Sequence, residues 1–243
     1  MSKNVLITGS SKGIGRSIAK ILAQNNYNVY LCARNELQLK DTMQEIGAQG
    51  YFAVDLTNTA KIKQLFENFI NEVGTIDILI NNAGNYVYSP IEKTTLSDME
   101  QSVKLNIEAP FILTQLAVEV MKKQKWGRIV NIGSISGVVG EGNATLYSMT
   151  KSAYIGFTKA LALELAQDNI TVNTIHPGWV ETELAQNAVE QSDFSYQEEL
   201  EMIPQRRFIH PDEIGELVRY LVSNEAKGLT GQNINLCAGL SVG

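Results

Sequence analysis

Short hydrophobic runs alternate with longer amphipathic stretches along the whole chain. The short runs are rich in β-branched and aliphatic residues, and several are apolar at every position, which is typical of buried parallel strands. The longer stretches repeat their apolar residues with helical spacing. Predicted strands cover residues 5–8, 29–32, 51–54, 76–81, 128–132, 171–175 and 233–236. Predicted helices cover residues 14–25, 36–46, 59–73, 97–123, 146–167 and 211–223.

Alternating strands and helices predict an α/β fold, a doubly wound sheet of about seven parallel strands with helices on both faces. No repeat or linker interrupts the pattern, so residues 1–243 are predicted to form a single domain. The exception is the segment 181–210, which is helical but weakly patterned. Open α/β sheets bind ligands beyond the carboxyl ends of their strands, so we predict that this segment is a lid over an apolar substrate. The alternative is a pair of surface helices.

The composition excludes several classes of protein. The chain has 243 residues, 44% of them hydrophobic, and 26 acidic against 20 basic side chains give a net charge of −6. One domain of this size can enclose a site, whereas the negative charge disfavours nucleic acid and anionic membranes as partners. No run of about 20 apolar residues occurs, and the N-terminus lacks the apolar stretch of a signal peptide, so we expect a cytoplasmic protein.

Cysteine and histidine are scarce. Cys32 and Cys237 cannot build a disulfide scaffold, and we expect buried neutral thiols. His176 and His210 each adjoin a proline and lack the spacing of a zinc site, so no metal is expected.

The first predicted strand leads directly into Thr8-Gly-Ser-Ser-Lys-Gly-Ile-Gly15, which opens the first helix. Glycines at such a junction permit a tight turn and let backbone N–H groups approach a pyrophosphate at the helix N-terminus. A structural turn is the alternative, but this spacing at this position favours a dinucleotide site and hence a Rossmann-like fold. The residues expected to contact the cofactor are Gly9, Ser11, Lys12, Gly13, Ile14 and Gly15.

The end of the second predicted strand indicates which dinucleotide is bound. An acidic residue there would accept hydrogen bonds from the ribose 2′-hydroxyl and repel a 2′-phosphate, but this chain has Arg34 followed by Asn35. The planar guanidinium of Arg34 and the ammonium of Lys12 suit a phosphate. We therefore predict NADP(H).

Tyr147 and Lys151 lie four residues apart in a predicted helix, so their side chains share one face. A lysine ammonium near a phenol stabilises the phenolate and lowers its pKa. Ser134 follows the predicted strand 128–132 and could donate a hydrogen bond to a substrate carbonyl beside the cofactor. These residue types predict acid–base chemistry at a carbonyl or alcohol.

These motifs, in this order, resemble the short-chain dehydrogenase/reductase family over essentially the whole chain. Thr8–Gly15 matches the family's cofactor loop, and Asn81-Asn82-Ala83-Gly84 matches its motif after the fourth strand. The resemblance implies that Asp55 and Leu56 lie at the adenine and that the stretch 177–182 closes on the nicotinamide. The further cofactor contacts that it implies are Asn82, Ala83, Gly84, Tyr147, Lys151, Pro177, Gly178, Val180 and Thr182.

The resemblance also implies catalytic roles for four residues. Tyr147 would donate a proton to the carbonyl oxygen, and Lys151 would lower the pKa of Tyr147 and hold the nicotinamide ribose. Ser134 would orient the carbonyl, and Asn106, in a distorted helical turn, would hold a water for proton relay.

Within the family, the stretches 126–134, 168–173 and 229–235 are most similar to bacterial 3-oxoacyl-acyl-carrier-protein reductases, with polyketide ketoreductases close. The resemblance implies NADPH-dependent reduction of a ketone to a secondary alcohol in fatty acid or polyketide biosynthesis. The substrate would be a 3-oxoacyl thioester, linked to acyl-carrier protein or CoA, or a polyketide-type β-keto compound. Arg128 and Lys122–Lys125 are the expected dock for an acidic carrier, and a homotetramer is the family's usual assembly.

Two alternatives stay open. On the same scaffold, the chain would be a dehydrogenase of a steroid, a sugar or another secondary alcohol. In a different class, it would be a dinucleotide-binding regulator without catalysis, against which the intact Asn106, Ser134, Tyr147 and Lys151 argue.

Overall fold

The computed structural model describes residues 2–191 and 195–242. Within them, one parallel sheet has the strand order β3-β2-β1-β4-β5-β6-β7, so the chain runs outward from β1 in one direction and from β4 in the other. This order is the predicted doubly wound, Rossmann-like sheet, and the predicted fold class is confirmed. The strands are β1 (Asn4–Thr8), β2 (Asn28–Ala33), β3 (Gly50–Ala53), β4 (Ile78–Asn81), β5 (Gly127–Ile132), β6 (Ile170–Pro177) and β7 (Asn233–Leu236).

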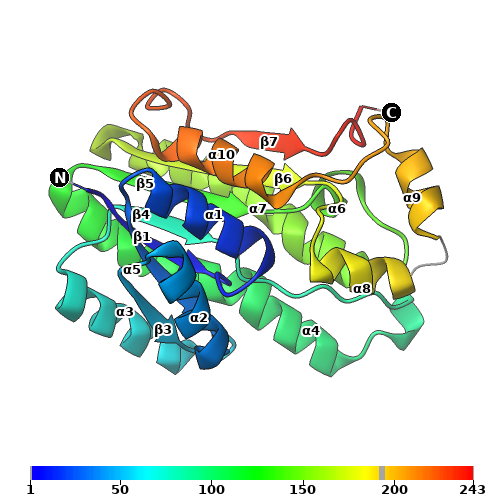
Figure 1. The fold of residues 1–243 in the computed structure, drawn as a ribbon, viewed down its shortest axis with the longest axis horizontal. Helices are drawn as coiled ribbons and strands as arrows, with labels where there is room; N and C mark the ends of the chain where they lie inside the picture. The colour runs from blue at the N-terminus through cyan, green and yellow to red at the C-terminus, as the bar shows by residue number, and fades with distance from the viewer. Residues whose placement is uncertain (1, 192–194, 243) are drawn as a thin grey trace.

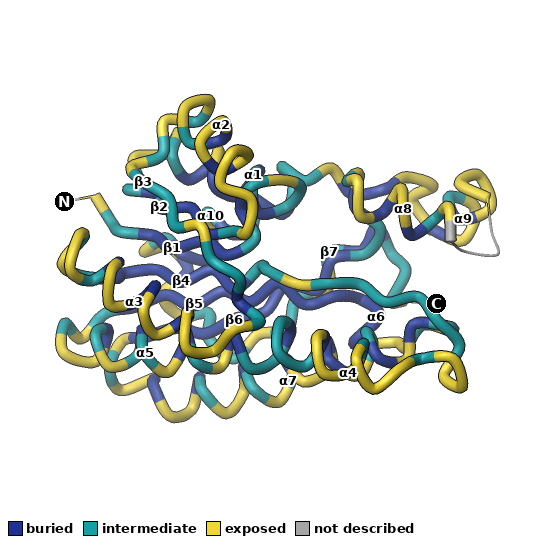
Figure 2. The backbone as a smooth tube through the Cα atoms, turned by 90° about the horizontal axis from the view of Figure 1, so that it is seen from below, coloured by how far each residue is buried: buried dark blue, intermediate teal, exposed yellow. Residues whose placement is uncertain are grey.

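Helices form a layer on each face of the sheet (Figure 2). The layer of α1, α2 and α10 lies on one face, and that of α3, α5 and α7 on the other. The bounds of these helices are α1 (Gly13–Gln24), α2 (Glu36–Ile46), α3 (Thr59–Val73), α5 (Ala109–Gln124), α7 (Thr145–Leu165) and α10 (Pro211–Val222). None of the helices in the described parts of the chain has the length and apolar character needed to cross a bilayer.

The wholly apolar strands are explained by this double covering. In β1, Val5 and Ile7 join the core beneath α1 and α10, whereas Leu6 between them joins the core beneath α3 and α5. In β4, Ile78 and Ile80 enter the first core and Leu79 the second. Successive strand residues point to opposite faces, so a strand covered on both sides is apolar at every position.

The predicted helix over 97–123 is one continuous helical path with a defect. It consists of α4 (Leu96–Val103), a π-helical turn (Lys104–Glu108) and α5. Pro110 has no N–H to donate to the carbonyl of Asn106 four residues earlier, which breaks the regular ladder at this point. π-Helical turns accommodate such a break and often occur at functional sites.

Figure 1 shows that α4, α8 and α9 lie beyond the arrowheads of the strands. The predicted lid contains α8 (Glu183–Gln191) and α9 (Tyr196–Met202), and its residues 192–194 lie outside the described part. The two ends of the segment meet, because Val180 and Ile209 form a parallel bridge and the Ile209 N–H donates to the carbonyl of Trp179 at 2.7 Å. The segment is therefore anchored at its base to the end of β6.

Candidate active site

Two cavities open at the carboxyl ends of the strands and meet at Tyr147. The first, of about 460 Å³, runs from the glycine loop past the end of β2 to Lys151. The second, of about 450 Å³, lies between the segment after β5 and helices α8 and α9. Residues that border both cavities are Ile14, Gly133, Tyr147, Thr182 and Leu184.

The glycine loop is built for close backbone approach. Gly9 has a φ of +65°, and a Cβ at Gly15 would lie 2.3 Å from the carbonyl oxygen of Gly9. Asn82 holds the loop in place, because its Nδ2 donates to the carbonyl oxygens of Thr8 at 2.8 Å and Gly9 at 3.0 Å. Side chains larger than hydrogen at Gly9 or Gly15 would separate these segments.

The N-terminus of α1 faces the first cavity without a side-chain cap. Lys12 at its N-cap makes no capping hydrogen bond, whereas Asn35 caps α2 and Asn58 caps α3. The first N–H groups of a helix need acceptors, and an anion provides them. The uncapped end of α1, bordered by Ser11, Lys12 and Gly13, therefore fits the phosphates of a dinucleotide.

The far end of the first cavity holds most of the residues predicted for adenosine. Arg34 and Leu56 border it, as do Asn35 and Gln38, which the sequence did not single out. Asp55 does not border it. The Asp55 carboxylate instead accepts hydrogen bonds from the backbone and hydroxyl of Thr57, and these bonds lower its pKa.

Lys12 is not a free cation in this structure. Its ammonium lies 2.8 Å from Oε2 of Glu183 at the start of α8, and both side chains are largely exposed. The structure thus shows Arg34 and Lys12 at the same cavity, with Lys12 paired across it.

The predicted catalytic residues converge where the two cavities meet. Ser134 lies just after β5, and Tyr147 and Lys151 lie on the adjoining face of α7. The Lys151 ammonium donates to the carbonyl oxygen of Ile132 at 2.9 Å and lies 5.8 Å from the centre of the Tyr147 ring. Lys151 is only 4% exposed.

Burial sets the protonation of this pair. It raises the pKa of Tyr147 to about 12, partly offset by the hydrogen bond with Ser134, and it lowers the pKa of Lys151 to about 8. The expectation that Lys151 lowers the pKa of Tyr147 is therefore not met here, because loss of solvation outweighs other influences. The environment favours the neutral phenol, which is the form that donates a proton.

Asn106 sits in the π-helical turn and links three parts of the site. Its Nδ2 donates to the carbonyl of Asn85 at 3.2 Å and to the Thr150 hydroxyl at 3.0 Å, and its Oδ1 accepts from the Asn85 N–H at 3.0 Å. Gly84 lies beside it, since a Cβ there would approach the Asn106 Oδ1 at 3.2 Å and the Lys151 Nζ at 3.3 Å. Ala83 and Gly84 also border the first cavity.

The residues expected at the nicotinamide divide between the cavities. Pro177, Gly178 and Val180 border the second cavity, and Thr182 borders both. A Cβ at Gly178 would lie 2.9 Å from the Cα of Cys237, so this stretch packs directly against the C-terminal segment. Both cysteines are buried as predicted, and burial raises the pKa of Cys32 to about 12.

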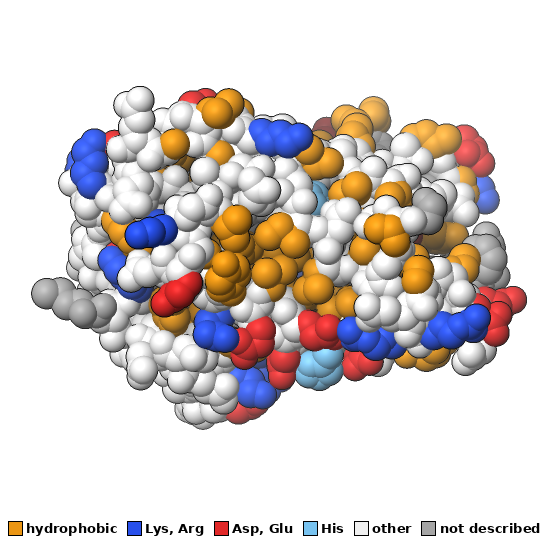
Figure 3. Space-filling model, turned by 90° about the horizontal axis from the view of Figure 1, so that it is seen from above, with side chains coloured by type: hydrophobic (Ala, Val, Ile, Leu, Met, Phe, Trp, Pro, Cys, Tyr) orange, Lys and Arg blue, Asp and Glu red, His pale blue; other side chains and the backbone are white. Residues whose placement is uncertain are grey.

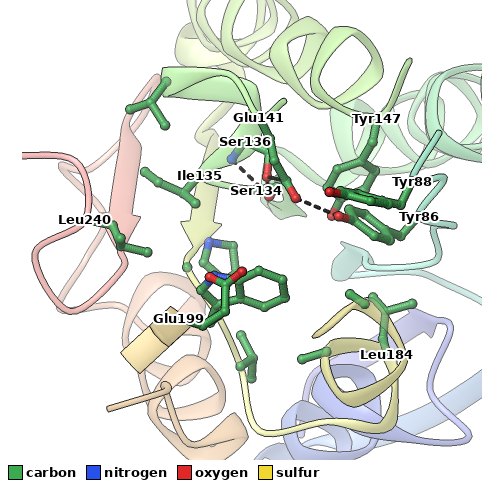
Figure 4. A pocket seen from close by; sticks show the side chains of 18 of the residues that line it. Tyr86, Tyr88, Ser134, Ile135, Ser136, Glu141, Tyr147, Leu184, Glu199 and Leu240 are labelled. Atoms are coloured by element: carbon green, nitrogen blue, oxygen red, sulfur yellow. Dashed lines mark hydrogen bonds between the residues drawn. The ribbon is translucent and has the colours of Figure 1, made fainter. Parts of the chain in front are cut away.

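Residues that shape the second cavity lie in loops 86–89 and 138–143, which the sequence indicates as substrate loops without giving their residues a role, and in the turn after Ser134. Figure 4 shows Tyr86, Ser136 and Glu141 gathered beside Ser134 and Tyr147. The Tyr86 ring stands edge-on to the Tyr147 ring, with centroids 4.9 Å apart. No local pattern assigned these residues a role, because Tyr86 lies on one segment and Ser136 and Glu141 lie in and after the short helix α6 (Ser136–Val139), and the two segments meet only in the folded chain.

His176, for which the sequence indicated no function, supports Ser134. It is fully buried in β6, with Nδ1 3.1 Å from the Ser134 carbonyl oxygen and Nε2 3.0 Å from Asn233 Oδ1. Among the described residues, no group of three or more histidine, cysteine or acidic side chains could hold a metal ion.

The predicted carrier dock is wrong. Arg128 is 1% exposed, its guanidinium donates to the carbonyl oxygens of Gly127 and Asn169, and Lys125 is paired with Asp168. Arg128 also lies near the amino end of β5, whereas Ser134 follows its carboxyl end. The strand separates the two by about 20 Å, so the 122–128 region lies at the opposite end of the sheet from the cavities.

A sheet wound in this order, with a glycine loop, a paired tyrosine and lysine and a strand-end serine at one edge, defines a nucleotide-dependent oxidoreductase. The family model for short chain dehydrogenases matches residues 3–193, and the chain belongs to this family.

Among its relatives is a 3-oxoacyl-acyl-carrier-protein reductase of Aquifex aeolicus, 38% identical over 240 residues that cover 97% of this chain and 96% of the relative. A putative ketoacyl reductase of the granaticin polyketide synthase from Streptomyces violaceoruber is 33% identical over 249 residues, covering 97% and 92%. Among solved structures, an actinorhodin polyketide ketoreductase with NADPH superposes with a TM-score of 0.94 at 34% identity, covering 98% of this chain and 97% of that one.

Proposed function

We propose that this protein reduces the ketone of a β-keto substrate to a secondary alcohol with NADPH. The observation that carries the proposal is the meeting of two cavities at Tyr147, one fitted to a dinucleotide and the other largely apolar. The names of the relatives, 3-oxoacyl-acyl-carrier-protein reductase and polyketide ketoreductase, support this substrate class.

In the first cavity, the uncapped end of α1 would hold the pyrophosphate and Arg34 the 2′-phosphate. Leu56, which borders the same cavity, would lie at the adenosine, and Asn82, Ala83 and Gly84 border the cavity toward Lys151. Bound NADPH supplies the hydride.

The chain's own residues handle the carbonyl and the proton. Ser134 would turn its hydroxyl from Ser136 to the substrate carbonyl oxygen and donate a hydrogen bond to it. The neutral phenol of Tyr147 would donate its proton to the same oxygen. Lys151, whose ammonium donates to the Ile132 carbonyl, would also hold the ribose hydroxyls of the cofactor. Its positive charge would stabilise the Tyr147 phenolate as it forms. Asn106 would hold the segments of Asn85 and Thr150 in place through its hydrogen bonds, and so would support Tyr147 and Lys151.

The substrate body would occupy the second cavity. Its apolar lining suits an acyl chain or a polyketide better than a sugar, and the described parts of α8 and α9 contribute Leu184, Ala185, Ala188 and Met202 to it. Helices α8 and α9 would thus form the lid over the substrate that the sequence predicted. A carrier-bound thioester is included in the proposal, with the carrier docked at the rim of this cavity and not near Arg128.

A homo-oligomer, a tetramer by family resemblance, is also proposed. Helices α5 and α7 carry exposed apolar side chains, including Phe111 and Leu163, the latter 84% exposed. On the face that carries α10 and β7, hydrophobic side chains gather in the centre with charged ones around them (Figure 3). Two buried, unpaired cysteines fit a reducing compartment, and we place the protein in the cytoplasm.

The test is a substrate panel followed by loss of NADPH absorbance. It contains 3-oxoacyl thioesters, simple ketones and, in the oxidative direction, polyols and a steroid alcohol with NADP⁺. We expect β-keto thioesters to be reduced fastest. Efficient oxidation of polyols or the steroid, with no reduction of β-keto compounds, would overturn the substrate class.

A further inference from the structure

Glu141 places a carboxylate in the wall of the second cavity, beside the reacting centre. Its Oε1 accepts a hydrogen bond from the Tyr86 hydroxyl at 2.6 Å, and its Oε2 accepts one from the Ser136 hydroxyl at 2.5 Å. Both oxygens act as acceptors, and these two hydrogen bonds fix the orientation of the carboxyl group. Each oxygen keeps a further lone pair for another donor.

This carboxylate is connected to Ser134 through one residue. The backbone N–H of Ser136 donates to the Ser134 Oγ at 3.2 Å, and the Ser134 hydroxyl lies 3.1 Å from the Ser136 Oγ. Since the Ser136 hydroxyl gives its proton to Glu141, it can only accept from Ser134. Glu141 therefore lies close to the point where the substrate carbonyl would sit, and Tyr86 links it to the Tyr147 ring.

A second acid enters the same cavity from the opposite wall. Glu199 projects from α9 toward the cavity in Figure 4 and is 6% exposed. Of the described residues that border this cavity, the carboxylic acids are Glu141 and Glu199, and none is a lysine or an arginine. The described remainder is aliphatic, aromatic, glycine or small and polar.

Two acids in a partly enclosed, largely apolar cavity discriminate between substrates by charge. A carboxylate that approaches them meets like charges in a medium of low dielectric constant, which is costly. A purely apolar body removes water from Glu141 without replacing its hydrogen bonds. A substrate that carries its own donor at the right distance replaces that water with a charge-assisted hydrogen bond.

We propose that Glu141, with Glu199 facing it, is a specificity-determining residue that selects β-keto substrates whose body carries a hydrogen-bond donor and rejects anionic ones. The donor is an ammonium or a hydroxyl group. This inference rests on the proposed function, since it concerns the substrate of the same site.

The test uses one series of 3-oxoacyl N-acetylcysteamine thioesters of equal chain length that end in methyl, hydroxyl, ammonium or carboxylate. kcat/KM is measured with NADPH for the unmodified protein and for Glu141→Gln, Glu199→Gln and a control, Glu201→Gln. Glu201 is an exposed acid on α9 outside the cavity lining, so its substitution changes the net charge equally. Thermal unfolding of each variant and its affinity for NADPH show whether the fold and the cofactor site persist.

For the unmodified protein we expect the ammonium and hydroxyl substrates to exceed the methyl one, and the carboxylate to be slowest by at least about tenfold. In Glu141→Gln, the ratio of the carboxylate to the methyl substrate should rise by about tenfold or more, mainly through KM. Glu199→Gln should shift the ratio in the same direction, and Glu201→Gln should leave it unchanged.

The possible failures are distinguishable. The role of Glu141 is refuted if all four thioesters are reduced with equal kcat/KM. It is also refuted if Glu201→Gln shifts the carboxylate-to-methyl ratio of kcat/KM as much as Glu141→Gln does. In both cases the proposed ketoreductase activity stands. If Glu141→Gln folds and binds NADPH but keeps the original ranking, the role of Glu141 is likewise refuted. If no member of the series consumes NADPH while the protein oxidises polyols, the proposed function fails, and the inference fails with it.

Discussion

The ammonium of Lys12 lies 2.8 Å from Oε2 of Glu183, and this ion pair joins the glycine loop to the first turn of α8. Both side chains are more than half exposed, so the pair adds little stability and can exchange for another partner. Arg34 carries no such direct ion pair to a described acidic residue. Arg34 is therefore expected to dominate recognition of a 2′-phosphate, with Lys12 second.

Replacing Arg34 with aspartate should reverse or remove the preference for NADPH. A charge-assisted hydrogen bond contributes about 1–3 kcal/mol, so the NADPH-to-NADH ratio of kcat/KM should fall by about tenfold to a hundredfold. Lys12→Ala should give a smaller fall. Lys20→Asp, an exposed change on α1 with the same change of charge, is the control. Equal use of both cofactors by the unmodified protein would contradict the assignment.

Tyr147→Phe should abolish most turnover while leaving the fold and NADPH binding intact. Loss of a general acid lowers the rate by at least about a hundredfold. Tyr154→Phe is a matched control on the same helix, because the Tyr154 hydroxyl is buried and has no hydrogen-bond partner among the described residues. Tyr154→Phe should keep activity and unfold at an equal or higher temperature. A Tyr147→Phe enzyme with near-normal kcat would require a different proton donor.

Lys151→Met should make the protein more stable at neutral pH although it removes activity. The folded pKa of about 8 lies below the ordinary 10.5, so stability from this group is lowest below pH 8 and rises as the pH passes from about 8 to 10.5. That difference corresponds to about 3 kcal/mol, from which the lost bond to Ile132 subtracts about 1 kcal/mol.

We therefore expect Lys151→Met to raise the free energy of unfolding by about 2 kcal/mol at pH 7 and to give no gain at pH 10. Urea denaturation at both pH values measures the difference. Lys159→Met, an exposed substitution on α7, should show no such pH dependence. A gain that is equal at pH 7 and pH 10 would argue against a penalty for charge burial.

Gly15→Ala should destabilise the protein by about 3 kcal/mol and weaken cofactor binding. Its Cβ would meet the Gly9 carbonyl at 2.3 Å and the Asn82 amide at 2.5 Å, so the loop must move. Gly228→Ala meets nothing within 4 Å and should be neutral. Denaturation curves and NADPH titrations compare the two, and unchanged curves for Gly15→Ala would show that the loop adapts freely.

kcat/KM should rise with the length of a 3-oxoacyl thioester until the second cavity is full. Each methylene taken out of water contributes about 0.8 kcal/mol, close to fourfold per carbon. Initial rates for chains of increasing length test this. A flat profile would mean that the acyl body lies outside the cavity.

Periodicity and turn chemistry were enough to predict the sheet and its helices, because these depend on local pattern. The meeting of Ser134 with Tyr147 and Lys151 was implied by the family resemblance. Other features depend on contacts between distant segments. The π-helical turn at Asn106 needed the effect of Pro110 on the helix ladder. The burial of Arg128 under Trp126 could not be distinguished in the sequence from an exposed basic cluster.

In the site, too, local pattern predicts some features, and contacts between distant segments determine the others. The motif around Tyr147 predicts its position, but the direction of its pKa depends on solvation that only the folded chain defines. The Glu141 carboxylate meets Tyr86 across 55 positions of sequence, so no local spacing could reveal the pair.

The bridge between Val180 and Ile209 has an evolutionary and practical consequence. A loop whose two ends are held together by backbone hydrogen bonds can change in length and sequence at little cost to the scaffold. We therefore expect the 181–208 insert to be exchangeable, because proton transfer and all of the expected cofactor contacts except Thr182 depend on residues that precede it. Grafting the corresponding insert of a relative between Val180 and Ile209 should transfer substrate preference without rebuilding the catalytic centre, so that one scaffold could serve many metabolic branches.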